Sequence, residues 1–227
     1  MRRVGLSPDD LDGVLVTHGH IDHISGIKML LKHHAVPVFT SRGAGYGIVA
    51  AIPESDVLMN CFDIGTEFDL GGIVIRSFNT PHDSSGSVGF TLAAGGSKLA
   101  YVTDLGYVTR AVAEAARGAD IAIIEANHDR DMLKYGSYPY RLKMRIMSEY
   151  GHLSNNDSGT LAAHLAATGT RHILLAHLSR ENNTPLLARA AVANALHAEG
   201  IAIGRDVEVD VAPHDGVSRV YELGGRD

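Results

Sequence analysis

The chain has 227 residues, of which 45% are hydrophobic and 20% are charged, as in an ordinary globular protein with a sizeable core. A net charge of −6 argues against bulk attraction to nucleic acid, although the local field at a cleft can differ. One cysteine excludes an internal disulfide and fits a reducing compartment. No run approaches the ~20 apolar residues that span a bilayer, and the charged first residues do not resemble a signal peptide. We therefore expect a cytoplasmic protein with no membrane partner.

The first half of the chain predicts short helices and a β-rich stretch. Ser7 and Pro8 indicate a helix start, with the helix ending near Gly13. Further helices are expected at residues 22–34 and 108–117, with a Gly-interrupted helix or loop at residues 42–52. Strands are expected at residues 14–16, 36–40 and 100–103. Residues 57–100 are expected to be β-rich, with turns at Gly71-Gly72 and Gly95-Gly96.

The second half alternates strands and helices. The predicted strands are residues 121–125, 172–176, 207–211 and 218–223. The predicted helices are residues 139–150, 154–167 and 184–199, and residues 126–138 are expected to be irregular. The pattern predicts a single α/β domain over residues 1–227, in two α/β halves of approximately 1–118 and 119–227. Helices on the outer faces of two sheets would bury the strands.

The main functional signal is the segment Thr17-His-Gly-His-Ile-Asp-His23, which directly follows a predicted buried strand. In an extended segment, residues two apart point the same way, so His18 and His20 can bind one ion together. Asp22 and His23 lie past the turn, at a helix start, and can reach a second ion. Imidazole and carboxylate are suitable ligands for zinc, manganese or iron. The alternative is a polar loop with three surface histidines, which four such side chains in six positions disfavour.

This H-x-H-x-D-H segment resembles the signature of the metallo-β-lactamase superfamily, whose fold is an αββα sandwich. The resemblance implies three later ligands, and His82, Asp104 and His177 each follow a predicted strand. The ligands that the family pattern implies are His18, His20 and His82 for the first metal, Asp22, His23 and His177 for the second, and Asp104 as a bridge. Two divalent ions, two aspartates and a shared hydroxide leave a charge of about +1, which favours an anionic substrate such as a phosphodiester.

Four further segments resemble the YycJ/WalJ branch of this superfamily, which is regarded as metal-dependent hydrolases with exonuclease-like activity on DNA. They are residues 125–128, 138–143, 151–155 and 176–185, so the resemblance covers nearly the whole chain. The segments with Glu125 and His152 also resemble loops of transfer-RNA 3′ processing nucleases. By that likeness, His152 donates a proton to the leaving oxygen and Glu125 orients or tunes it. The alternative for His152 is a local hydrogen bond beside a helix cap.

We therefore expect a two-metal phosphodiesterase or nuclease that acts on DNA through a metal-bound hydroxide, with zinc or manganese as the metal and iron as a further option. The catalytic candidates are Asp22, Glu125 and His152. Residues 134–145 combine cations and tyrosines that could hold a nucleic-acid strand, although a solvated helix face is equally compatible. The candidate substrate-binding residues are Tyr138, Arg141, Lys143 and Ser179. Cys61 is expected to be a buried thiol.

Two other functions stay open. One is a small-molecule hydrolase of the same fold, acting on a lactam, lactone, thioester or cyclic phosphodiester. The other is an inactive metal-binding form. In the resembled family a Ser/Gly-rich strand pair precedes the histidine cluster, whereas 17 residues precede His18 here. We therefore expect the sandwich to lack its first N-terminal strands, with an open sheet edge that destabilises it or pairs in a homo-oligomer.

Overall fold

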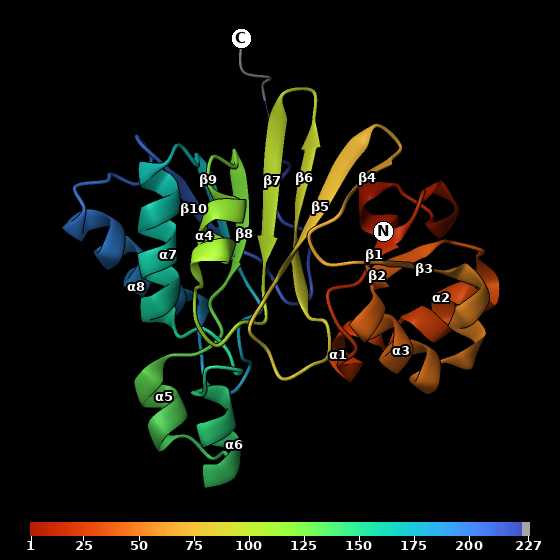
Figure 1. Ribbon diagram of the computed structural model, residues 1–227. Helices are drawn as coiled ribbons and strands as arrows, with labels where there is room; N and C mark the ends of the chain where they lie inside the picture. Colours follow the sequence, from red (N-terminus) through yellow and green to blue (C-terminus); the bar gives the residue numbers. More distant parts are fainter. Residues whose placement is uncertain (224–227) are drawn as a thin grey trace.

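The protein is described here over residues 1–223, from a computed structural model with two β-sheets and helices outside each sheet (Figure 1). The smaller sheet is parallel, with the strand order β1-β2-β3. Its strands are β1 (Val14–Leu15), β2 (Val38–Ser41) and β3 (Met59–Phe62). The helices beside it are α1 (Ile21–Ile24), α2 (Ile27–His33) and α3 (Arg42–Ala51).

The larger sheet has seven strands in the order β10-β9-β8-β7-β6-β5-β4. Neighbouring strands from β4 to β7 are antiparallel, and those from β7 to β10 are parallel. The strands are β4 (Glu67–Leu70), β5 (Ile73–Asn79), β6 (Val88–Ala94), β7 (Ser97–Val102), β8 (Ile121–Glu125), β9 (His172–Ala176) and β10 (Glu208–Val211). The helices that connect the parallel strands are α4 (Arg110–Ala116), α7 (Asn155–Ala167) and α8 (Pro185–Ala198).

The tight turns of the antiparallel part confirm the glycine signals in the sequence. Gly71 and Gly72 connect β4 to β5 with φ values of 62° and 82°, and Gly95 and Gly96 connect β6 to β7 with φ values of 55° and 80°. Two-residue hairpin turns with positive φ at both positions match the twist of the strands. Glycine adopts this conformation without the steric penalty of a side chain.

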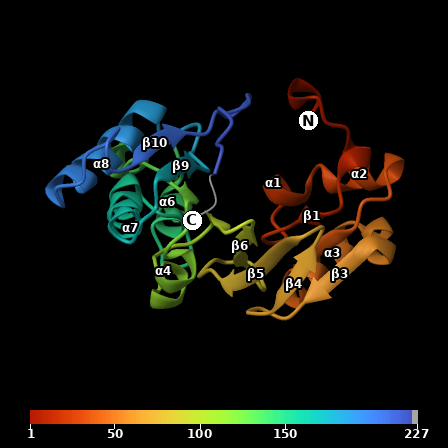
Figure 2. The ribbon, with the colours of Figure 1, turned by 90° about the horizontal axis from the view of Figure 1, so that it is seen from above.

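Three apolar clusters fill the spaces between four layers. The largest lies between the seven-stranded sheet and α4, α7 and α8, and a second lies between the smaller sheet and α1–α3. The third lies between the sheets, where Phe39 stacks on Phe68 at 5.5 Å between ring centroids. Figure 2 shows the same succession of layers from above. The structure therefore confirms the predicted α/β sandwich with helices on both outer faces.

Five expectations from the sequence need correction. Residues 218–223 form no strand, and Tyr221 instead donates a hydrogen bond to Asp210 at 2.9 Å. Residues 126–138 contain the helix α5 (Arg130–Tyr135), which the Asp129 carboxylate caps. The helix expected at residues 22–34 is two helices, α1 and α2. Cys61 is exposed. The larger sheet takes strands from both sides of residue 118, so the predicted halves do not correspond to the sheets.

The fold brings the carboxyl ends of several strands to one edge. Strands β5, β7, β8 and β9 all run in the same direction, so the loops that follow them meet there. The helices α5 and α6 (Tyr140–Ile146) lie beyond this edge, at the bottom of Figure 1. Within the described residues, no helix is long and apolar enough to cross a membrane.

Candidate metal centre

The structure brings all seven predicted metal ligands together. Three groups made up only of these seven residues have potential ligand atoms within 4.8 Å of one another, namely His18 with His20 and His82, His18 with His23 and Asp104, and Asp22 with His23 and His177. These residues follow β1, β5, β7 and β9 or lie in α1, so residues far apart in the sequence share one edge of the fold. The groups form two adjacent clusters, because they share His18 and His23. The first cluster is His18, His20 and His82, and the second is Asp22, His23 and His177.

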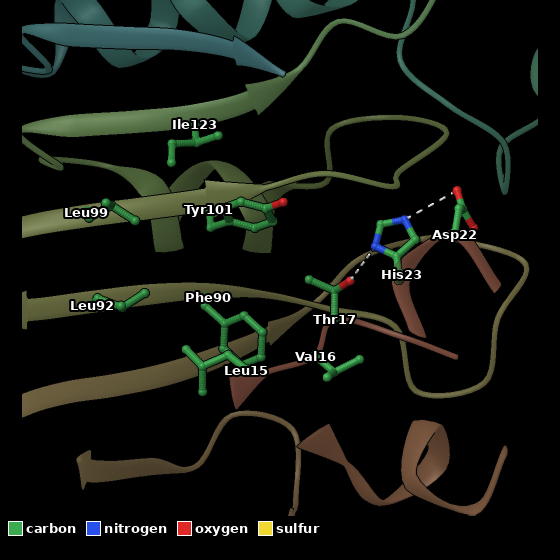
Figure 3. Close-up of a pocket in the computed structure, with 10 residues that line it drawn as sticks. All are labelled: Leu15, Val16, Thr17, Asp22, His23, Phe90, Leu92, Leu99, Tyr101 and Ile123. Atoms are coloured by element: carbon green, nitrogen blue, oxygen red, sulfur yellow. Dashed lines mark hydrogen bonds and ion pairs between the residues drawn. The ribbon is translucent and has the colours of Figure 1, made fainter. Parts of the chain in front are cut away.

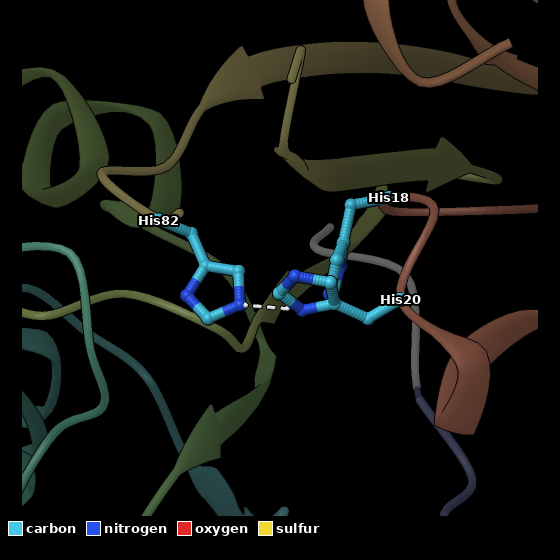
Figure 4. A group of neighbouring side chains, drawn as sticks. All are labelled: His18, His20 and His82. Carbon is cyan, nitrogen blue, oxygen red and sulfur yellow. Dashed lines mark hydrogen bonds between the residues drawn. The ribbon is translucent and has the colours of Figure 1, made fainter. Parts of the chain in front are cut away.

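The first cluster consists of His18, His20 and His82 (Figure 4). The Nε2 atom of His82 lies 3.2 Å from Nδ1 of His20. The other ring nitrogen of His82 donates a hydrogen bond to the carbonyl of Gly151 at 3.0 Å, which leaves Nε2 for an ion. The Nε2 atom of His18 is buried and has no hydrogen-bond partner in the described part of the chain. A buried nitrogen of this kind fits a metal ion, because burial without a partner is otherwise unfavourable.

Thr17 orients two of the imidazole rings. Its hydroxyl oxygen lies 3.1 Å from Nδ1 of His18 and 3.4 Å from Nδ1 of His23. A partner at Nδ1 leaves Nε2 of each ring available as a ligand atom. Burial, followed by the charges of His23 and His82, lowers the pKa of His18 from 6.5 to about 2. His18 is therefore neutral at physiological pH, as a metal ligand must be.

Asp104 lies between the two clusters. Its Oδ1 atom is 3.8 Å from Nε2 of His82, and its Oδ2 atom is 3.5 Å from Nε2 of His23. The Asp104 side chain is 1% exposed, and within residues 1–223 its Oδ2 atom has no hydrogen-bond partner. An unpartnered buried carboxylate oxygen is costly unless it binds a cation. The residues present therefore fit a pair of divalent metal ions with Asp104 between them.

Asp104 and His177 also share an unusual backbone conformation. Their φ values are 60° and 58°, and in the described residues they are the only non-glycine positions with positive φ. This left-handed region disfavours side chains with a Cβ atom, and such residues concentrate at functional sites. In both cases the conformation occurs where β7 or β9 gives way to a loop. The strained backbone aims the two ligands into the site.

Glu125, the last residue of β8, is a fully buried acceptor of four hydrogen bonds. Its Oε1 atom accepts from Nδ1 of His152 at 2.8 Å and from Nδ1 of His177 at 2.7 Å. Its Oε2 atom accepts from the backbone N–H groups of Leu153 and Leu105 at 3.0 and 3.3 Å. A further set of potential metal ligands, with atoms within 4.8 Å of one another, consists of Asp104, Glu125, His152 and His177. Because both Glu125 oxygens already accept hydrogen bonds, this carboxylate acts as a partner of the histidines.

The buried charges shift the pKa values of this group. Burial raises the pKa of Glu125, but the charges and hydrogen bonds of His152 and His177 outweigh burial and hold it well below 4.5. Burial lowers the pKa of His177, but the Glu125 hydrogen bond and the Asp104 charge raise it overall to about 9. The pKa of His152 is also raised, because the charge and hydrogen bond of Glu125 outweigh burial. Without metal, His177 is therefore protonated and positively charged at neutral pH.

A groove of about 400 Å³ adjoins His152, His177 and Asp22. The predicted substrate residues Tyr138 and Ser179 line it. The structure does not bring the other two candidates there. The Lys143 ammonium donates to the carbonyls of Lys134 and Gly136 at the end of α5, and Arg141 is exposed on α6. The groove also includes Arg145, from the cationic stretch at residues 134–145, and two residues that were not predicted from the sequence, Asn127 and Arg180.

A second cavity, of about 510 Å³, lies between the two sheets (Figure 3). Most of its wall is apolar, from Leu15 and Val16 on one side to Phe90, Leu99 and Ile123 of the larger sheet on the other. Its polar end contains the ligand residues Asp22 and His23 together with Thr17, and Figure 3 shows these side chains beside one another. An apolar wall behind the ligands strengthens the electrostatic interactions of the metal centre.

Two residues that contact the predicted ligands, Thr17 and Asp83, were not predicted, although the sequence offered a weak signal for them. Thr17 and Asp83 directly precede and follow predicted ligands, and hydrogen bonds to ligands commonly come from such neighbours. Nothing in the local sequence connects Asp83 to its partner Arg145, because the two are 62 residues apart.

Comparisons with known proteins agree with this geometry. Residues 1–178 match the family model described as a β-lactamase superfamily domain. Exodeoxyribonuclease YycJ of Bacillus anthracis is 34% identical over 211 residues, which are 92% of this chain and 79% of that protein. Exodeoxyribonuclease WalJ of Streptococcus pneumoniae is 32% identical over 219 residues, which are 94% of this chain and 81% of that protein.

Solved structures support the fold. The metallo-β-lactamase fold protein YhfI of Bacillus subtilis superimposes with a TM-score of 0.67 at 19% identity, over 90% of this chain and 76% of that one. Fold, ligand clusters and sequence similarity lead to the same assignment. The chain belongs to the metallo-β-lactamase-fold superfamily of metal-dependent hydrolases, within its YycJ-like group.

Proposed function

We propose that this protein is a two-metal phosphodiesterase that acts on DNA as an exonuclease. The observation that carries the proposal is the pairing of His152 with Glu125 directly beside the ligand clusters, with Nδ1 of His152 2.8 Å from the carboxylate. A phosphodiester oxygen leaves poorly without a proton, and a held histidine can supply one. The relatives named exodeoxyribonucleases support DNA as the substrate.

In this proposal, the two clusters would hold two zinc or manganese ions. The residues that would hold them are His18, His20 and His82 for the first ion, Asp22, His23 and His177 for the second, and Asp104 for both. When bound, such ions lower the pKa of water and so supply a nucleophile at neutral pH. Imidazole and carboxylate ligands suit both metals.

The protein residues orient the substrate and move the proton. Glu125 fixes Nδ1 of His152 as the hydrogen-bonded atom, so Nε2 is the atom that delivers the proton to the leaving oxygen. The same Glu125 oxygen accepts from Nδ1 of His177, which leaves Nε2 of that ring for the second ion. Tyr138 and Ser179, which line the groove, would contact the substrate strand.

The proposal is tested with a panel of substrates on metal-loaded protein. The panel consists of end-labelled single-stranded and duplex DNA, bis-p-nitrophenyl phosphate and nitrocefin, each with Mn²⁺ and Zn²⁺. We expect stepwise shortening of DNA from an end and slower cleavage of bis-p-nitrophenyl phosphate, with no turnover of nitrocefin. Turnover of nitrocefin without cleavage of DNA would replace this function with a small-molecule hydrolase.

A further inference from the structure

Arg145 of α6 makes a two-point ion pair beside the first ligand cluster. Its Nε and Nη2 atoms donate to the two oxygens of Asp83 at 2.5 and 2.9 Å. Asp83 directly follows the ligand His82, and its Oδ1 atom lies 3.6 Å from Nε2 of both His82 and His20. The guanidinium is therefore fixed against the loop that carries a metal ligand.

This ion pair leaves part of the guanidinium free for another partner. Arginine has five N–H donors in a planar fork, and the two hydrogen bonds to Asp83 leave three of them. The Arg145 side chain is 47% exposed and lines the groove that also contains His152 and His177. A planar guanidinium with a free edge matches the geometry of a phosphate group.

The charges of the groove favour an anion. Its charged lining residues, apart from the two histidines, are Arg145, Arg180 and Asp22, and Asp22 is a proposed metal ligand. The remaining polar residues of the lining, Asn127, Tyr138 and Ser179, are neutral hydrogen-bonding groups. Both arginines have aspartate partners outside the lining, Asp83 for Arg145 and Asp215 for Arg180. With metal on Asp22, no carboxylate of the lining would remain free to repel an anion, and the guanidinium groups would offer it their remaining donors.

We propose that Arg145 binds a backbone phosphate of the substrate strand in this groove, next to the phosphate that is cleaved, and that Asp83 is the positioning residue for Arg145. The inference rests on the proposed function and adds a specific anchor for the substrate. Fixing the guanidinium before binding reduces the side-chain ordering that binding would otherwise require. The rival role for the pair is purely structural, as a link between α6 and the loop after β5.

The test compares four substitutions in a His152→Ala background, so that DNA is bound while cleavage is slow. They are Arg145→Ala, Arg145→Lys, Asp83→Asn and, as a matched control, Arg189→Ala on the exposed side of α8. The affinity for a short fluorescent single-stranded oligonucleotide is measured by anisotropy over a range of salt concentrations. Metal content and melting temperature are measured for every variant.

We expect Arg145→Ala to weaken binding about tenfold and to reduce the slope of log affinity against log salt by ~0.7, the share of one phosphate contact on a single strand. Arg145→Lys and Asp83→Asn should weaken binding less and keep the slope, because the cation remains while its fixed geometry is lost. Arg189→Ala should change neither quantity.

Two results would reverse these assignments separately. If Arg145→Ala keeps wild-type affinity and slope but melts at a lower temperature, the ion pair is only structural, and the inference about Arg145 is wrong. The second result concerns protein with His152 intact. If this protein binds DNA, and Arg145→Ala weakens that binding as expected, but it cleaves no phosphodiester, the proposed function is wrong while the phosphate site stands.

Discussion

One carboxylate oxygen of Glu125 links the metal centre to the proton donor. Oε1 accepts hydrogen bonds from both His177 and His152, at 2.7 and 2.8 Å. His177 is a proposed metal ligand and His152 a proposed acid, so a change of charge on one ring alters the hydrogen bond of the other. The roles of these residues can be separated only by measuring metal content and turnover together.

The His152→Ala variant should lose turnover of DNA while retaining metal. General-acid assistance is typically worth ~10²–10⁴-fold in rate. The loss should be much smaller for bis-p-nitrophenyl phosphate, because p-nitrophenolate leaves without a proton. Steady-state kinetics on both substrates, with elemental analysis, checks this expectation. The control is His164→Ala, an exposed histidine of α7. Equal losses on both substrates, or loss of metal, would assign His152 a structural or ligand role.

The Asp104→Ala variant should lower metal occupancy at both positions, because Asp104 lies within 3.8 Å of a ligand nitrogen from each cluster. The Asp22→Ala variant should lower occupancy by about one ion, because Asp22 belongs only to the second cluster. Elemental analysis after reconstitution with excess metal measures both values. Loss of a single ion in Asp104→Ala would show that this carboxylate serves one position only.

At the scale of elements, the loops that follow β8 and β9 are connected to the start of α7 by buried amides. Asn155 and Asn183 exchange hydrogen bonds between their side chains at 2.9 and 2.8 Å. The amide nitrogen of Asn183 also donates to the carbonyl of Ala126 at 2.8 Å. Asn127, the residue after Ala126, donates to the carbonyl of His177 at 3.0 Å. These bonds fix the positions of the segments that carry Glu125, His152 and His177 relative to one another.

The Asn183→Ala variant should therefore be less stable by about 1–3 kcal/mol, because it leaves buried partners without hydrogen bonds. The double variant with Asn155→Ala should lose less than the sum of the two single losses, since the residues share their bonds. Urea denaturation measures the free energies of unfolding, with the exposed Asn156→Ala as control. Additive losses would mean that the two amides act independently.

The elements also show what the sequence could and could not predict. The H-x-H-x-D-H segment and its resemblance to a family pattern named seven candidate ligands. The structure brings them together because His18, His82, Asp104 and His177 each follow a strand at one edge of the fold. The φ values of Asp104 and His177 and the Arg145–Asp83 pair depend on distant segments, which local patterns do not encode. Residues 218–223 contain Val220, Tyr221 and Leu223 but have no strand partner among the described residues, and pairing decides whether such a segment becomes a strand. Asp129, whose carboxylate caps α5, is the type of residue that favours a helix start and was a signal for this helix in the sequence.

At the scale of the whole molecule, the metal-free protein should become less stable as the pH rises from about 6.5 to 9. The folded protein raises the pKa of His177 from 6.5 to about 9. A raised histidine pKa adds stability that is complete below 6.5 and disappears as the pH passes the folded value. The lowered pKa of Glu125 has the opposite effect on the free energy of unfolding. Its contribution to stability is present above about pH 4.5 and is lost as the pH falls into the acid range.

This expectation is checked by urea denaturation in the presence of a chelator at several pH values between 5 and 9.5. The His177→Gln variant should show a flatter decline over the alkaline part of that range. Stability that rises between pH 6.5 and 9 in the unaltered protein would contradict the assignment of a proton to His177.

The left-handed backbone at Asp104 and His177 has a consequence for anyone who would transplant this centre into another scaffold. A host chosen only for the positions of its Cβ atoms would present both side chains from ordinary right-handed or extended backbone, and so aim them elsewhere. Each residue in this conformation carries a conformational penalty of about 1–3 kcal/mol. The host would need rigid strand ends as well as the seven ligands. The part to transfer therefore includes the two junctions at which β7 and β9 continue into loops.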